Sequence, residues 1–240
     1  MRVRPLFAFA FSVAAFSRPC LAMVDCERIA PCTASAKRTY TVAAIGDSLT
    51  DVRVGGGRYL GALARRCPLS RFDAYGVGGQ RTNHMRWRFL EDVFGVGAAR
   101  RAAKPAYTHV IVLGGINDLS AAPTTGVGLH DIQRNLTFMY QAARARGVKV
   151  VALTLPPWGY APGRDLRPEV TRLLNRWILS LPTAGAVDFA VDIHPLLSCG
   201  DADALCDRFR IRPDDAVHWN EAGHEVVAEA LVRAVFGDCQ

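Results

Sequence analysis

Short apolar runs alternate with longer helical patterns along this chain, and that alternation constrains its fold more than any other feature. The apolar runs lie at residues 40–45, 72–76, 108–113, 148–154 and 186–191. The helical patterns lie at 57–66, 85–101, 130–146, 166–180 and 220–236. Strands separated by helices pair in parallel and need helices on both faces of their sheet. We therefore predict an α/β fold with a five-stranded parallel sheet.

The first residues have the pattern of a secretory signal peptide. Basic residues precede an apolar run over 6–16, and small residues follow at 20–22. The apolar run is shorter than the roughly 20 residues of a membrane span. Arginine and proline just before Cys20 disfavour a lipoprotein signal. We predict cleavage after Ala22, a single domain over 23–240, and a secreted or periplasmic location.

The cysteines indicate disulfides. Six remain beyond the predicted signal peptide: Cys26, Cys32, Cys67, Cys199, Cys206 and Cys239. An even number in an exported chain is typical of a disulfide framework, although six cysteines allow 15 pairings. Short spacing favours Cys26 with Cys32 and Cys199 with Cys206, which leaves Cys67 for Cys239; the connectivity stays open. Zinc binding is the alternative, but no CxxC or HxxxH spacing supports it.

The net charge is modest once the signal peptide is set aside. The whole chain carries +7, and removal of three N-terminal arginines without any acidic residue leaves +4. The remaining arginines are scattered through helical patterns, whereas nucleic-acid binding is typical of a clustered basic stripe. We therefore expect neither a nucleic-acid partner nor a stable membrane anchor.

Polar and glycine-rich segments follow the predicted strands. They lie at 46–48, 75–80 and 114–118, and a fourth, at 214–220, precedes the last helix. In open α/β sheets, ligands bind beyond the carboxyl ends of the strands. These four segments are therefore expected to meet at one edge of the sheet.

The residue types in these segments suit acyl transfer. Ser48 follows the first strand, and a serine needs a base to become a good nucleophile. His218 is the best base candidate among the six histidines, because Asp215 stands three residues earlier and can orient the ring. The Gly79 N–H and the Asn117 amide can stabilise an oxyanion. Ordinary turn chemistry explains each segment alone, but not all four in order.

The chain resembles the GDSL, or SGNH, hydrolase family. Four blocks carry the resemblance: Gly46-Asp47-Ser48-Leu49-Thr50, Gly78-Gly79-Gln80-Arg81-Thr82, Gly115-Ile116-Asn117-Asp118 and Asp215-Ala216-Val217-His218. The resemblance spans about residues 40–236. It implies a flavodoxin-like three-layer α/β/α sandwich that needs no metal or organic cofactor.

The resemblance also assigns roles to residues. It makes Ser48 the nucleophile, His218 the general base and Asp215 its orienting acid. It builds the oxyanion hole from the backbone N–H groups of Ser48 and Gly79 and from the Asn117 side chain. By the same resemblance, three further polar residues have structural roles: Asp47, Asp118 and Asn175.

The expected function is that of a secreted serine esterase. It would hydrolyse carboxylic esters through an acyl-serine intermediate, with short acyl groups or acetylated carbohydrate favoured. Trp158, Tyr160 and Trp219 could line the substrate site, or could simply pack near its rim. The alternatives are an acyltransferase, a lysophospholipase or thioesterase on the same fold, and a non-catalytic binding protein.

Overall fold

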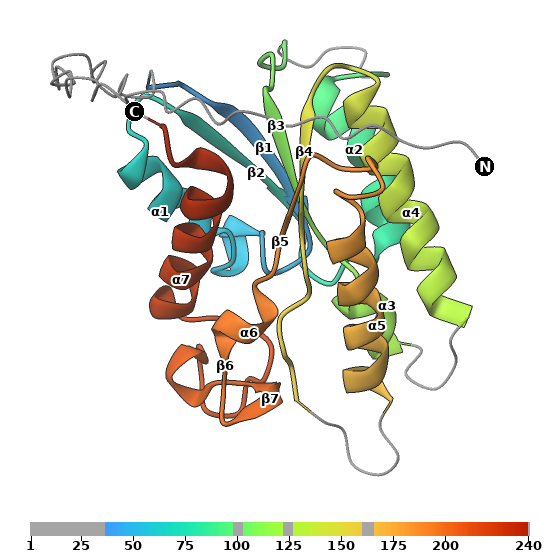
Figure 1. Ribbon diagram of the computed structural model, residues 1–240, viewed down its shortest axis with the longest axis vertical. Helices are drawn as coiled ribbons and strands as arrows, with labels where there is room; N and C mark the ends of the chain where they lie inside the picture. Colours follow the sequence, from blue (N-terminus) through green and yellow to red (C-terminus); the bar gives the residue numbers. More distant parts are fainter. Residues whose placement is uncertain (1–36, 98–102, 122–126, 160–165, 240) are drawn as a thin grey trace, which may run out of the picture. The chain divides into compact units, whose positions relative to one another are not determined.

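The computed structural model describes residues 37–97, 103–121, 127–159 and 166–239. Five strands form one parallel sheet in the order β2-β1-β3-β4-β5 (Figure 1). They are β1 (Thr41–Gly46), β2 (Arg71–Gly76), β3 (His109–Leu113), β4 (Lys149–Leu153) and β5 (Phe189–Val191). The predicted five-stranded parallel sheet is therefore confirmed. The predicted signal peptide and the Cys26/Cys32 pair lie outside the described residues.

The central strands are apolar because both faces of the sheet are covered. In β1, the four residues from Val42 to Ile45 have no exposed surface, and β3 is buried throughout. α1 (Arg58–Arg66) and α7 (Glu221–Leu231) pack together on one face. The other face carries α2 (Thr82–Phe94), α4 (Val127–Arg144) and α5 (Arg167–Ser180) (Figure 1). The predicted α/β sandwich of three layers is the observed architecture.

The largest difference from the sequence-based boundaries concerns the second helix. The pattern predicted a helix over 85–101, but α2 begins at Thr82 and ends at Phe94. It ends there because Gly95 adopts a left-handed backbone with φ of 70°, which caps the helix and turns the chain away. Several short elements were not predicted at all: η1 (Val52–Val54), α3 (Ile116–Ala121), α6 (His194–Leu197), β6 (Ser198–Cys199), β7 (Asp201–Leu205) and η2 (Asp207–Phe209). The helix predicted over 220–236 consists of α7 and a π-helical turn, η3 (Val232–Phe236).

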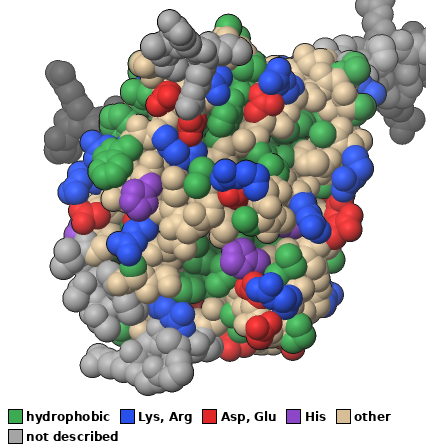
Figure 2. Space-filling view, turned by 180° about the vertical axis from the view of Figure 1, so that it is seen from behind, with side chains coloured by type: hydrophobic (Ala, Val, Ile, Leu, Met, Phe, Trp, Pro, Cys, Tyr) green, Lys and Arg blue, Asp and Glu red, His purple; other side chains and the backbone are tan. Residues whose placement is uncertain are grey.

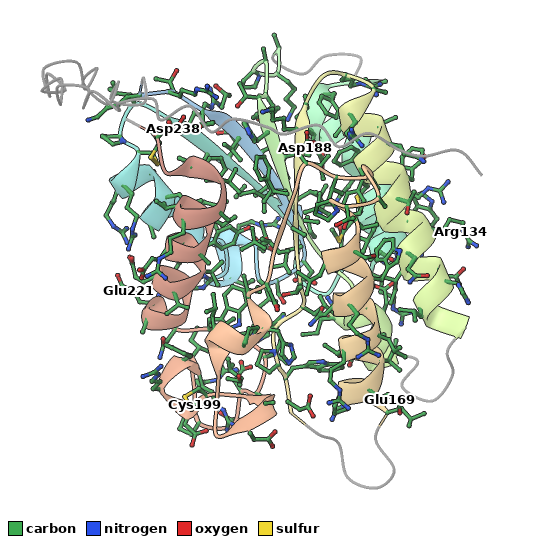
Figure 3. The ribbon with its side chains drawn as sticks, in the orientation of Figure 1. Arg134, Glu169, Asp188, Cys199, Glu221 and Asp238 are labelled. Atoms are coloured by element: carbon green, nitrogen blue, oxygen red, sulfur yellow. A yellow bond between two sulfur atoms is a disulfide. The ribbon has the colours of Figure 1, made fainter. Side chains whose placement is uncertain are left out.

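Two disulfides are formed within the described residues. One joins Cys67, just after α1, to Cys239, and the other closes the β6–β7 hairpin between Cys199 and Cys206 (Figure 3). Both pairings agree with the favoured connectivity, and they exclude zinc ligation by these four thiols. Disulfides persist in oxidising compartments, so this chemistry is consistent with an extracellular protein.

The two ends of the described domain lie beside each other at the amino ends of the strands. The Arg38 N–H donates to the Asp238 carbonyl over 2.8 Å, and Arg38 also forms a β-bridge with Cys239. In Figure 3, Asp238 and Asp188, which precedes β5, lie at this edge, whereas Cys199 and Glu221 lie toward the opposite one. The opposite edge is where the strands end and where the motif-bearing loops begin.

Arginines are distributed over the surface and mostly contact nearby acids. On the face shown in Figure 2, cationic side chains are interspersed with acidic and hydrophobic ones. For example, Arg66 and Glu225 lie 2.7 Å apart, and Arg134 pairs with Asp131 over 2.6 Å. Exposed pairs of this kind contribute about 0–1 kcal/mol each to stability.

Across the described helices, none has both the length and the apolar character required to cross a membrane.

Candidate active site

The four sequence motifs meet at the carboxyl edge of the sheet, where the strand order changes direction. The chain passes from β1 to β2 on one side of β1 and then crosses to β3 on the other. Ser48 follows β1, Gly79 follows β2, and Asn117 lies in α3 directly after β3. His218 arrives from the loop before α7. Such a switch point is the usual ligand site of an open α/β sheet.

Ser48, His218 and Asp215 form a continuous hydrogen-bonded row. Ser48 Oγ lies 2.9 Å from His218 Nε2. On the other side of the ring, His218 Nδ1 lies 3.1 and 3.0 Å from the two carboxylate oxygens of Asp215. A carboxylate accepts only, so Nδ1 carries the proton and leaves Nε2 free to accept from the serine hydroxyl. This geometry can remove a proton from Ser48.

Asp215 is held as an anion by its own loop. Its Oδ1 accepts backbone hydrogen bonds from Val217 over 3.0 Å and from His218 over 2.9 Å. Burial acts to raise the pKa of Asp215, but the backbone donors and the imidazole outweigh it, so the pKa lies below its ordinary value. The three-residue spacing therefore orients the ring and keeps the orienting group charged.

Two backbone N–H groups in the first two motifs are available as hydrogen-bond donors. Within the described part of the chain, the backbone N–H groups of Ser48 and Gly79 donate no hydrogen bond to another residue. The neighbouring Gly78 N–H is occupied, because it donates to Asp51 Oδ2 over 2.9 Å. Gly79 has a φ of 73° and open space where a side chain would be. Gly79 rather than Gly78 is thus the available donor of the second motif.

The amide of Asn117 has a defined orientation. Its Nδ2 donates one hydrogen bond to the Gln80 backbone carbonyl over 2.9 Å. An amide nitrogen carries two hydrogens, so one remains for a ligand. Together with the backbone donors of Ser48 and Gly79, this hydrogen can receive a developing negative charge.

Asp47 directly precedes Ser48 in the chain and is completely buried. Its Oδ1 accepts from the Leu49 N–H over 3.0 Å and so fixes the turn that presents Ser48. Its Oδ2 has no hydrogen-bond partner among the described residues. Burial raises the pKa of Asp47 from 3.8 to about 7, although the Leu49 N–H and the nearby His218 oppose the rise. The residue braces the turn, as expected, and does so at an electrostatic cost.

Asp118 and Asn175 also serve the scaffold. Asp118 accepts from both the backbone N–H and the hydroxyl of Thr82, over 2.9 and 2.7 Å, and thereby joins the third motif to the start of α2. Asn175 exchanges two hydrogen bonds with the backbone of Leu155, over 2.7 and 2.9 Å. That exchange fixes the loop after β4.

The aromatic residues considered for substrate contact are mostly buried. Trp158 is 4% exposed, and its indole N–H donates to Thr171 Oγ1 over 3.0 Å, so its faces are unavailable for stacking on a sugar. Trp219 is 1% exposed and is a wall of the small cavity beside Ser48. The burial of Trp158 favours the packing role that the sequence left as the alternative, whereas Trp219 lines the cavity beside Ser48. Tyr160 lies outside the described residues.

The space beside Ser48 is small. A cavity of about 10 Å³, the size of a single water molecule, adjoins Ser48. Its other walls come from the loop after Ser48 and from the loop and helix around His218: Leu49, Val54, Gly55, Gly56, Ile211, His218, Trp219 and His224. Gly56 is needed here, because a Cβ on it would lie 1.9 Å from the Ser48 carbonyl oxygen.

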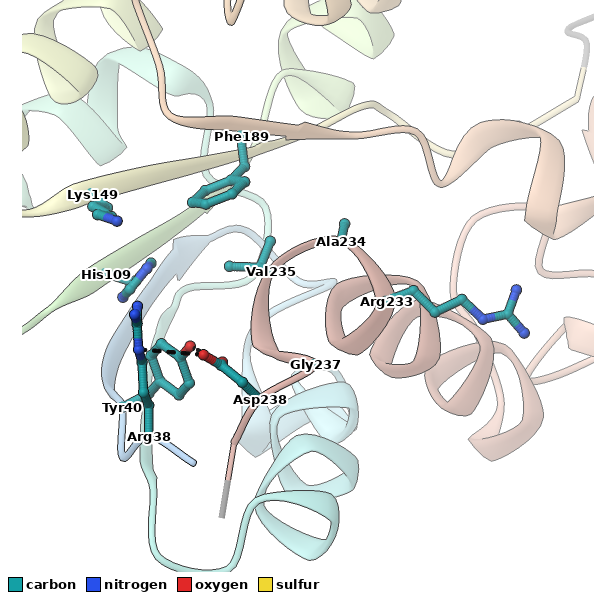
Figure 4. A pocket seen from close by; sticks show the side chains of 10 residues that line it. All are labelled: Arg38, Tyr40, His109, Lys149, Phe189, Arg233, Ala234, Val235, Gly237 and Asp238. Carbon is teal, nitrogen blue, oxygen red and sulfur yellow. Dashed lines mark hydrogen bonds and ion pairs between the residues drawn. The ribbon is translucent and has the colours of Figure 1, made fainter. Parts of the chain in front are cut away.

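A larger cavity, of about 230 Å³, lies at the opposite edge of the sheet (Figure 4). Figure 4 shows Tyr40, His109 and Asp238 around it, all near the amino ends of the strands. Burial lowers the pKa of His109 to about 4, so this ring is neutral at physiological pH. The cavity lies away from Ser48 and does not belong to the motif-bearing edge.

No group of three or more His, Cys, Asp or Glu side chains in the described chain is placed to bind a metal ion.

Two residues with clear contacts to the site were missed by sequence reasoning. Asp51 accepts from the Gly78 N–H and from Arg53, and these donors hold the pKa of Asp51 down to about 2 despite its burial. Arg88 reaches from α2 to the carbonyls that end β1 and β2. An acid within a glycine-rich turn is a weak signal for Asp51, and the helical pattern holds no signal for Arg88.

Comparisons with known proteins agree with this architecture. A GDSL-like lipase from Bacteroides thetaiotaomicron has 20% identity and a TM-score of 0.63, over 81% of this chain and 86% of that one. A lipolytic protein of the G-D-S-L family from Veillonella parvula has 20% identity and a TM-score of 0.60, over 82% and 98%. A catalytic mutant of an acetylxylan esterase from Geobacillus stearothermophilus has 18% identity and a TM-score of 0.60, over 81% and 93%. At these identities the likeness establishes the fold.

Family membership rests on the sequence itself. No curated protein matches the chain significantly. The model of the GDSL-like lipase/acylhydrolase family matches residues 44–226, which include all four motifs and most of the described domain. This chain therefore belongs to the GDSL-like lipase/acylhydrolase family, whose members are ester hydrolases.

Proposed function

We propose that this protein is a secreted serine esterase that hydrolyses carboxylic esters through an acyl-Ser48 intermediate. The observation that carries the proposal is the row from Ser48 Oγ through His218 to Asp215, with 2.9 Å between the hydroxyl and the imidazole. A serine, a base and an orienting carboxylate in this order are the requirements of nucleophilic acyl transfer.

Each step of the reaction has a residue to serve it. Ser48 Oγ attacks the ester carbonyl while His218 Nε2 takes the hydroxyl proton. The carbonyl oxygen becomes an oxyanion and receives hydrogen bonds from the N–H groups of Ser48 and Gly79 and from Asn117 Nδ2. His218 then gives its proton to the departing alcohol. A water molecule, activated by the same ring, releases the acid and restores Ser48.

The acyl group is proposed to be short. The cavity beside Ser48 has room for about one water molecule, and its walls include the bulky side chains of Val54, Ile211 and Trp219. The methyl group of an acetyl ester is close in size to a water molecule, whereas a long acyl chain would have to lie over the surface. An alcohol portion made of carbohydrate is supported only by analogy with the acetylxylan esterase of similar fold.

The proposal is tested with p-nitrophenyl esters of increasing acyl length. The purified mature chain should hydrolyse the acetate fastest, and Ser48→Ala should abolish turnover. Ser180→Ala, at an exposed serine on α5, is the matched control and should keep full activity. Hydrolysis that survives Ser48→Ala would refute the nucleophile. Release of p-nitrophenol with acyl transfer to added glycerol or sugar, without free acid, would indicate the acyltransferase alternative.

Two further parts of the proposal have their own tests. A fluorophosphonate probe should label Ser48, and failure to label would support a non-catalytic binding protein. Export is proposed from the pattern of residues 1–22 and is supported by the two disulfides. Mass spectrometry of the protein recovered from its host should find a chain that begins at Met23.

A further inference from the structure

Arg88 makes an unusual set of contacts for a residue in the middle of a helix. Its side chain is only 15% exposed. Nη2 donates to the Gly46 carbonyl over 2.9 Å, and Nη1 donates to the Tyr75 carbonyl over 2.8 Å. Asp92, one turn later in α2, lies 2.8 Å from Nη1 and balances the charge. The guanidinium therefore ties α2 to the ends of both strands that lead into the first two motifs.

The fourth contact of this guanidinium is to the loop formed by residues 78–80. Arg88 Nε donates to Gln80 Oε1 over 2.6 Å. Gln80 directly follows Gly79, and its backbone carbonyl is the acceptor for Asn117 Nδ2. Arg88 thus binds the side chain of Gln80, and the backbone carbonyl of Gln80 binds Asn117.

The hydrogen bond to Gln80 decides which end of the Asn117 amide faces the substrate. An amide can rotate by 180° and exchange its oxygen for its nitrogen. With the Gln80 carbonyl as acceptor, the position of the nitrogen is fixed, and its second hydrogen stays available to a ligand. If the Gln80 carbonyl moved away, Asn117 could present its oxygen instead, which would repel an oxyanion.

Residues 78–80 are consequently fixed at both ends. Asp51 Oδ2 accepts the Gly78 N–H over 2.9 Å, and Arg88 holds the side chain of Gln80. Gly79, between them, has a left-handed backbone that leaves its N–H without a partner in the described chain. An unpaired donor stays in place only if its neighbours are held.

We propose that Arg88 is a positioning residue of the oxyanion hole, which acts through Gln80 to keep the Asn117 amide oriented for the transition state. The proposal rests on the proposed esterase function. It assigns no contact with substrate to Arg88 or Gln80, so their loss should lower kcat and leave KM nearly unchanged.

The test uses Gln80 variants, in which the contacts of Arg88 with the strands remain. Gln80→Met removes the acceptor and should lower kcat about 10- to 100-fold, with KM within about twofold. Gln80→Glu restores an acceptor for Arg88 and should lose less than Gln80→Met. Gln141→Met, at an exposed position on α4, is the matched control. Arg88→Lys, tested in parallel, should likewise lower kcat and leave KM nearly unchanged, because a lysine cannot make the four contacts.

A double-mutant cycle with Asn117→Ala separates positioning from general damage. If Gln80 acts through Asn117, Gln80→Met should cost less than about threefold further in kcat once Asn117 is gone. Equal losses in both backgrounds, an unchanged kcat for Gln80→Met, or a loss confined to KM would each overturn the proposal. Failure of the esterase function is distinguishable, because then the unmodified protein would show no Ser48-dependent hydrolysis.

Discussion

Replacing Asp47 by asparagine is expected to stabilise the folded protein at neutral and alkaline pH, although Asp47 belongs to the first of the four sequence motifs. Asp47 is fully buried, and Oδ2 has no partner in the described chain. Its pKa rises from 3.8 to about 7, chiefly because burial disfavours the anion. A rise of that size corresponds to about 4 kcal/mol of tighter proton binding in the folded state.

The sign of the pH dependence follows from that rise. Between about pH 4 and pH 7 the folded state keeps a proton at Asp47 that the unfolded state has lost, so stability falls as pH increases. Asp47→Asn has no such proton, and its Oδ1 can still accept from Leu49. The free energy of unfolding of the variant, minus that of the unmodified protein, should therefore increase by about 4 kcal/mol from about pH 4 to pH 8.

Urea denaturation at several pH values between about 4 and 8 measures this difference directly. Glu225→Gln is a suitable control, because Arg66 lowers the pKa of Glu225, and the matching stability loss appears only as pH falls below its ordinary value. The difference for this control should be flat above about pH 6. A flat difference for Asp47→Asn over the same range would refute the electrostatic reasoning.

Three further outcomes are expected. Asp215→Asn should lower kcat about 10⁴-fold, because the amide would donate to His218 and impose the wrong ring tautomer; a loss below tenfold in steady-state kinetics would contradict the orienting role. Serine at both Cys67 and Cys239 should lower the free energy of unfolding by about 5 kcal/mol in urea, since this disulfide spans 172 residues; no change would exclude it as a stabiliser. Ile211→Ala should raise kcat/KM for the butanoate relative to the acetate about tenfold, because Ile211 walls the cavity beside Ser48; an unchanged ratio would place the acyl group elsewhere.

Much of the sheet could be predicted because its central strands are buried on both faces. Such strands read as continuous apolar runs, and residues 40–45 and 108–113 are of this kind. The position of the candidate site could be predicted because Ser48, Gly79 and Asn117 lie shortly after apolar runs of this kind. Parallel strands all end at one edge, so position along the chain translates into position in space.

Other features depend on contacts between distant segments. Arg88 looks like any helical arginine in the sequence, and its role arises only because α2 packs across the ends of β1 and β2. Trp158 was a candidate for contact with the substrate, but Thr171 supplies a buried partner for its indole N–H. Neither contact can be predicted from a local sequence pattern, because each joins segments that are distant along the chain.

The neighbouring positions of residues 38 and 239 give this domain the geometry for circular permutation. A short linker could join the two positions, because the Arg38 N–H already contacts the Asp238 carbonyl. New termini could open at Gly185, a turn between α5 and β5 with open space around it. Both the junction and the opening would lie at the amino edge of the sheet. The loops at the edge that carries Ser48 would remain uncut. If the enzyme were attached to a solid support through the new termini, this edge would face the solution that holds the substrate.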